Sequence, residues 1–89
     1  MRLSPDFAEA LAILGDLYAR RGQLQQAMAR YREALRSKPR FGRAHLGLGA
    51  TLAANHDVTG AREHLTVAAQ DPNPEVRQEA QELLRQLAR

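Results

Sequence analysis

The chain contains 89 residues and has a mass of 9.9 kDa and a formal net charge of +3. It has 13 Leu and 16 Ala, whereas Val, Ile and Thr together number seven, and this excludes most β architectures because strands favour β-branched and aromatic side chains. Four aromatic residues, none of them Trp, and the small core of so short a chain exclude a deep enclosed active site. We therefore expect an all-α domain.

Cysteine is absent, which excludes disulfides, thiolate metal sites and thiol nucleophiles. No apolar run is long enough for a secretory signal or a membrane span, so we expect a soluble protein with the cytoplasm as the favoured compartment. Residues 1–44 carry a net charge of +5 and residues 45–89 a net charge of −2, with basic and acidic side chains interleaved. This pattern predicts neither a nucleic-acid partner nor a membrane surface.

Two helices are predicted at the start of the chain, over residues 7–20 and 23–36, because small and apolar residues recur there at spacings of three and four. Asp6 and Glu9 have the spacing of a capping box, Gly22 supplies a permissive turn, and Pro39 ends the second helix. The two stripes consist of Ala8, Leu11, Leu14, Gly15 and Tyr18, then Leu24, Ala27, Met28, Tyr31, Ala34 and Leu35. Together they predict a helical hairpin.

The same plan returns 34 residues later, with eight identities between the two periods. It predicts helices over 41–54 and 57–70, joined by a turn in which His56 takes the place of Gly22, since histidine tolerates positive φ. A fifth helix is expected over 74–88, with Asn73 as its cap and Pro74 in its first turn. No partner helix follows it.

The spacing Leu11-x2-Leu14-Gly15-x2-Tyr18, followed by Ala27-x3-Tyr31-x2-Ala34 and Pro39, resembles the tetratricopeptide repeat signature, with Leu for the usual Trp and Tyr for the usual Phe. Repeat one would span about 8–41 and repeat two about 42–75, where His45, Leu52 and Asn73 depart from the signature. The resemblance implies a single α-solenoid domain of antiparallel helical hairpins over 1–89, with the polar-faced helix 75–88 as its C-terminal cap.

The N-terminal end has an unfinished pattern. In the 34-residue phase, Arg2-Leu3-Ser4-Pro5 corresponds to the tail of a helix whose earlier part is missing, so we interpret the chain as the C-terminal part of a longer protein. An upstream neighbour would then cover the hairpin face near Phe7, Leu11 and Tyr18. We predict self-association through this face at high concentration.

No catalytic, cofactor or metal site is predicted. The three histidines, His45, His56 and His64, do not share a face, and the acids Glu75, Glu79 and Glu82 are interpreted as members of surface ion pairs. No serine–histidine–aspartate order, phosphate loop or zinc-protease motif occurs. The basic run from Arg30 to Arg43 is interpreted as solvated surface and helix-terminal cations, the alternative being a patch for an acidic ligand.

The resemblance places function in a concave groove lined by the first helix of each hairpin. The predicted partner-binding residues are Glu9, Ala12, Asp16 and Arg20 from the first helix, Arg43, Leu46 and Ala50 from the third, and Arg77, with Ala80 and Leu84, from the last. They predict acids on one wall, an apolar floor and arginines on the other wall, where Arg43 and Arg77 could bind a carboxylate. The positions that would match a chaperone-tail clamp hold Ala12, Asp16, Gly47, Arg77 and Gln81, which disfavours that subclass.

We therefore expect a protein–protein interaction scaffold without enzymatic activity or cofactor, which presents a rigid groove to a peptide or partner domain. Two alternatives stay open. The chain could be the structural cap of a longer repeat array, or an accessory docking or dimerisation domain of a multidomain enzyme.

Overall fold

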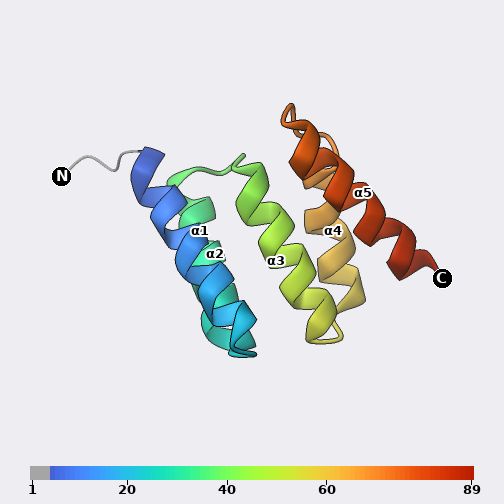
Figure 1. The fold of residues 1–89 in the computed structure, drawn as a ribbon, viewed down its shortest axis with the longest axis horizontal. Coiled ribbons are helices and arrows are strands. Elements are labelled where there is room, and N and C mark those ends of the chain that lie inside the picture. Colours follow the sequence, from blue (N-terminus) through green and yellow to red (C-terminus); the bar gives the residue numbers. More distant parts are fainter. Residues whose placement is uncertain (1–4) are drawn as a thin grey trace.

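The computed structural model describes residues 5–89, which form five α-helices (Figure 1). The helices are α1 (Pro5–Arg20), α2 (Leu24–Ser37), α3 (Gly42–Ala54), α4 (Val58–Ala68) and α5 (Pro74–Ala88). No strand occurs within this part of the chain, so the all-α prediction is confirmed, and each helix bound lies within two residues of its prediction. The predicted helix remnant at Arg2-Leu3-Ser4 lies outside the described residues.

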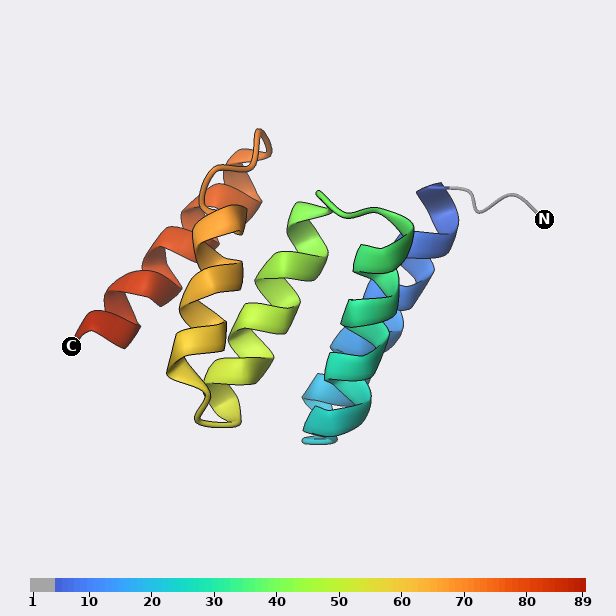
Figure 2. The same cartoon turned by 180° about the vertical axis from the view of Figure 1, so that it is seen from behind.

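The helices stack as antiparallel hairpins in a solenoid. α1 packs on α2 and α3 packs on α4, while the contacts between α2 and α3 join the two hairpins and α5 closes the stack against α4. Figure 1 shows α1 and α5 in front of α2 and α4, and Figure 2 shows the reverse order from behind. Since α3 also contacts both α1 and α5, these three helices line one face of the molecule.

Small side chains allow this close stacking. Eight alanines are fully buried, and the largest fully buried side chains are Tyr31, Leu48 and Leu65. A Cβ atom added to Gly49 would lie 2.7 Å from Cγ of Leu65, so α3 and α4 approach each other only because Gly49 has no side chain. The excess of alanine in the composition is therefore a packing requirement.

The two hairpin turns use the same backbone conformation at equivalent positions. Gly22 has φ of 75° and His56, 34 residues later, has φ of 66°, which confirms the prediction of a positive-φ histidine. α5 begins as predicted, because the Asn73 side chain accepts a hydrogen bond from the backbone N–H of Glu75. The capping box predicted at Asp6 depends on a side chain outside those that the structure describes.

One face of α1 leaves large apolar side chains exposed. This α1 apolar face consists of Phe7, Ile13, Leu14 and Leu17. Leu14 is 43% exposed, whereas Leu48, its equivalent in α3, is 1% exposed. The sequence prediction is correct for Phe7 but wrong for Leu11, which is buried, and for Tyr18, which packs against the core.

The described helices are too short or too polar to cross a lipid bilayer.

Candidate functional site

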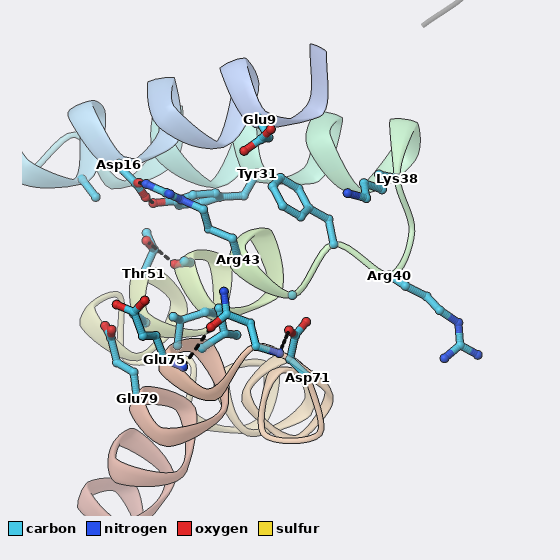
Figure 3. Close-up of a pocket in the computed structure, with 18 of the residues that line it drawn as sticks. Glu9, Asp16, Tyr31, Lys38, Arg40, Arg43, Thr51, Asp71, Glu75 and Glu79 are labelled. Carbon is cyan, nitrogen blue, oxygen red and sulfur yellow. Dashed lines mark hydrogen bonds and ion pairs between the residues drawn. The ribbon is translucent and has the colours of Figure 1, made fainter. Parts of the chain in front are cut away.

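A hollow of about 850 Å³ lies along the face formed by α1, α3 and α5 (Figure 3). We call it the groove. Leu46, Ala50 and Ala54 form part of its floor, because their spacing of four places them in one row along α3. The loop between α2 and α3 closes one end.

Tyr31 of α2 lies beneath the groove and is almost fully buried. Its ring fits between two glycines, since an added Cβ would lie 2.7 Å from Cε1 at Gly15 of α1 and 2.5 Å from the same atom at Gly47 of α3. Its hydroxyl donates a hydrogen bond to Oδ1 of Asp16 at 2.5 Å. Burial and this hydrogen bond raise the pKa of Tyr31 well above its usual range, so the hydroxyl keeps its proton.

An ion pair crosses from α3 to α1 above that tyrosine. Nη2 of Arg43 donates to Oδ2 of Asp16 at 2.9 Å, and this hydrogen bond raises the pKa of Arg43. Asp16 therefore accepts one hydrogen bond on each oxygen, from Tyr31 and from Arg43. Because both partners of the ion pair are partly solvated, the pair is worth about 1 kcal/mol or less, and its main effect is to fix the position of the guanidinium.

The opposite rim of the groove belongs to α5 and carries Glu75, Val76 and Glu79, which we call the α5 rim. Figure 3 shows the side chains of Glu75 and Glu79 next to each other on this helix. Neither carboxylate forms an ion pair within residues 5–89. Glu82, one turn further along, does pair with Arg85 as predicted.

Asp71 precedes α5 and also borders the groove. Its Oδ1 accepts a hydrogen bond from the backbone N–H of Asn73 at 2.8 Å, while its Oδ2 sits where a Cβ of Gly42 would be. Asp71 thus joins the α4–α5 loop to the start of α3, where a carboxylate is favoured by the helix dipole.

A family model described as "Tetratricopeptide repeat" matches residues 14–74, more than half of the chain. The chain belongs to the tetratricopeptide repeat family. No curated protein and no solved structure matches it. Tetratricopeptide repeats mediate protein–protein interactions and are typically non-enzymatic.

In this tetratricopeptide domain, six of the eight predicted groove residues do line the groove. They are Glu9, Asp16, Arg20, Arg43, Leu46 and Ala50. Ala12 does not, because it is 0% exposed and packs in the core between the helices. Arg77 does not line it either, because its Nη1 donates to the carbonyl oxygen of Asp71 at 3.1 Å and turns toward the α4–α5 loop.

The predicted placement of Arg77 on the groove is therefore wrong, and the α5 rim is acidic instead. Ala80 is fully buried and Leu84 packs against the core, so these two expected groove residues face inward. Sequence reasoning also missed Tyr31 and Gly47 as parts of the site. Two glycines within one turn of α3, Gly47 and Gly49, were the available signal, because glycine in a helix marks a close approach.

Two of the three histidines meet, a contact that was not predicted from the sequence. Nδ1 of His45 lies 3.0 Å from Nδ1 of His64, with the rings stacked, because α3 and α4 are antiparallel neighbours. Nε2 of His45 lies 2.9 Å from the carbonyl oxygen of Pro39, which can only accept, so we assign the proton to that nitrogen. Nδ1 of His45 then accepts from Nδ1–H of His64.

The histidine pair stabilises the contact between the two helices of the second hairpin. Burial, followed by the charge of His45, lowers the pKa of His64. No group of three or more metal-binding side chains occurs among the described residues.

Proposed function

We propose that this tetratricopeptide domain is a protein–protein interaction scaffold that binds a peptide segment of its partner in the groove. The observation that carries this proposal is a hollow of about 850 Å³ whose floor is fixed by Tyr31, Asp16 and Arg43. These side chains link α1, α2 and α3, so a partner meets a surface that is already ordered. A preorganised surface loses less conformational entropy on binding.

The chemistry of the floor supports a peptide as ligand. Ala50 and Ala54 are small, Leu46 adds apolar surface, and charged side chains stand on the rims. A concave apolar surface with a few convergent polar groups is the usual form of a binding pocket.

The test compares a substitution that fills the groove with the same substitution on an outer surface of the domain. Dodecapeptides selected from a phage library against the immobilised chain supply ligands, whose affinity is measured by calorimetry. Ala50→Arg should weaken peptide binding by about tenfold or more, because the new side chain occupies the floor of the groove. A tenfold loss of affinity corresponds to about 1.4 kcal/mol of binding free energy. Thr66→Arg, which adds the same side chain to the exposed outer face of α4, is the matched control and should change nothing.

Equal affinity of the two variants would place the ligand elsewhere and overturn the proposal. A library that yields no binding peptide would overturn it as well. Circular dichroism of both variants confirms that the helices are retained.

A structural role as the cap of a repeat array is a second candidate, supported by the outer face of α5. That face is polar and exposed at Gln78, Gln81, Arg85 and Gln86, as a terminal helix in a solenoid requires. If capping were the only role, Ala50→Arg would alter neither partner capture nor stability.

We also propose that the α1 apolar face mediates self-association. Its four side chains are each between 43% and 49% exposed and follow one side of the helix. At the equivalent position of the second hairpin, Leu48 is covered by α2 and the rest of the core. A second copy of the chain could cover Leu14 in the same way.

A further inference from the structure

We propose that the groove selects a partner segment carrying a Lys or Arg side chain, which the α5 rim binds through Glu75 and Glu79. This inference rests on the proposed function, because it names the chemistry of the peptide that the same groove takes. It differs from the sequence prediction, which expected arginines to bind a carboxylate.

The first step is that the arginines expected to bind a carboxylate are already engaged. Arg43 donates to Asp16 at 2.9 Å, and Arg77 donates to the backbone carbonyls of Asp71 and Pro72. A ligand carboxylate at Arg43 would have to compete with Asp16, which Tyr31 holds in place. Because Arg43 already pairs with Asp16, a ligand carboxylate would gain less there than at an unpaired cation.

The second step is that the two cations of the α2–α3 loop lie away from the α5 rim. Lys38 and Arg40 belong to the α2–α3 loop, and Figure 3 shows them at the opposite end of the groove from Glu75 and Glu79. The Lys38 ammonium stands 4.7 Å from the centre of the Phe41 ring, a cation–π contact that holds it there.

The third step is that the carboxylates of the α5 rim are free to bind a cation from a ligand. Glu75 and Glu79 are exposed, sit one turn apart on α5 and form no ion pair within residues 5–89. Like charges four residues apart on a helix repel each other slightly, and a cation between them removes that repulsion. Glu9 of α1 is a further acid that lines the groove.

The fourth step is that the apolar surface beside these carboxylates suits a long basic side chain. Val76 lies on the α5 rim, and Leu46 and Ala50 lie on the adjoining floor. The methylene stem of Lys or Arg can pack on this surface while its charged end reaches the carboxylates. The apolar floor and the charge of the α5 rim therefore both favour a basic side chain.

The experiment uses the library-selected dodecapeptides and two double variants of the full chain. Glu75→Lys with Glu79→Lys reverses the α5 rim, whereas Glu63→Lys with Glu82→Lys makes the same change in net charge outside the groove lining. We expect the selected peptides to share a Lys or Arg at one position. Their affinity should fall by about tenfold or more for the first variant and stay within about twofold for the second.

A peptide in which that Lys or Arg is replaced by Glu should bind the Glu75→Lys, Glu79→Lys variant better than the wild type. Wild-type binding should weaken as salt is raised, because the charges involved are exposed. Selected peptides without a common basic residue, or equal binding to both double variants, would overturn the inference.

The same variants distinguish failure of this inference from failure of the proposed function. If Ala50→Arg abolishes binding while reversal of the α5 rim has no effect, the groove binds peptides but not through a basic side chain. If Ala50→Arg has no effect, the groove is not the binding surface, and both proposals are wrong.

Discussion

Gly47→Ala tests how tightly the ring of Tyr31 is held between the first two hairpins. The added methyl group would lie 2.5 Å from Cε1 and Cζ of Tyr31 and 2.8 Å from its hydroxyl oxygen. Carbon atoms in contact are normally about 3.5–4.0 Å apart, so the overlap is about 1 Å. The ring has no room to retreat, because Gly15 closes its other side and Asp16 binds its hydroxyl.

Two effects of this substitution oppose each other. Alanine is a better helix former than glycine by about 1 kcal/mol, which stabilises the variant. Overpacking costs about 1–3 kcal/mol, and a shift of the ring that breaks its hydrogen bond to the Asp16 carboxylate costs about 1.5–3 kcal/mol more. We expect the destabilising effects to exceed the gain in helix propensity, so that the free energy of unfolding falls by about 2 kcal/mol.

The assay is urea denaturation followed by circular dichroism, carried out as a double-mutant cycle with Tyr31→Leu. Leucine occupies the equivalent position of the second hairpin, as Leu65, and it lacks the ring atoms that Gly47→Ala would strike. In the Tyr31→Leu background the alanine should therefore be neutral or stabilising by up to about 1 kcal/mol. Equal destabilisation in both backgrounds, or a stabilised Gly47→Ala single variant, would refute the reasoning.

Three further predictions concern the histidines and the α1 apolar face. Since burial and His45 lower the pKa of His64 from its usual 6.5, the unfolded chain binds more protons than the folded chain as the pH falls below 6.5. The free energy of unfolding should therefore decrease with falling pH in this range, and His64→Asn should remove that part of the decrease. His56→Gly should raise the free energy of unfolding by about 1 kcal/mol, because glycine adopts a φ of 66° without steric cost. In sedimentation equilibrium, the wild-type mass should rise with concentration, whereas Leu14→Glu with Leu17→Glu should stay monomeric.

A different result would contradict each of these three predictions. A pH dependence that is the same with and without His64 would contradict the first, and lower stability of His56→Gly the second. A wild-type chain that remains a monomer at millimolar concentration would contradict the third.

The helices could be predicted from the sequence because their signals are local. Apolar spacing marks the helices, and Gly22 and His56 mark the turns at the same phase of the repeat. The groove floor followed from the same phase, since Leu46 and Ala50 lie on one side of α3.

The α5 rim could not be predicted because it depends on how α5 is rotated against its neighbours. Successive residues of a helix point about 100° apart, so placing Arg77 on the groove moved Glu75 and Glu79 to the outer surface. Contacts with α3 and α4 decide the rotation instead, and they bury Ala80.

Side-chain contacts between helices also could not be predicted from the spacing of apolar residues. The pairing of Asp16 with Arg43 and that of His45 with His64 join residues 27 and 19 positions apart. Such pairs form only where two helices come close enough, and the buried alanines and glycines set that distance. The apolar spacing of one helix carries no information about its distance from another helix.

The most direct test of the account is a map of backbone amide chemical shifts in the chain as a selected dodecapeptide is added. The account predicts the largest changes on both sides of the groove, at Leu46 and Ala50 of α3 and at Val76 and Glu79 of α5, with Thr66 on the outer face of α4 unchanged. Changes centred on the outer face of α4 or on the α1 apolar face would contradict the claim that the groove is the binding surface.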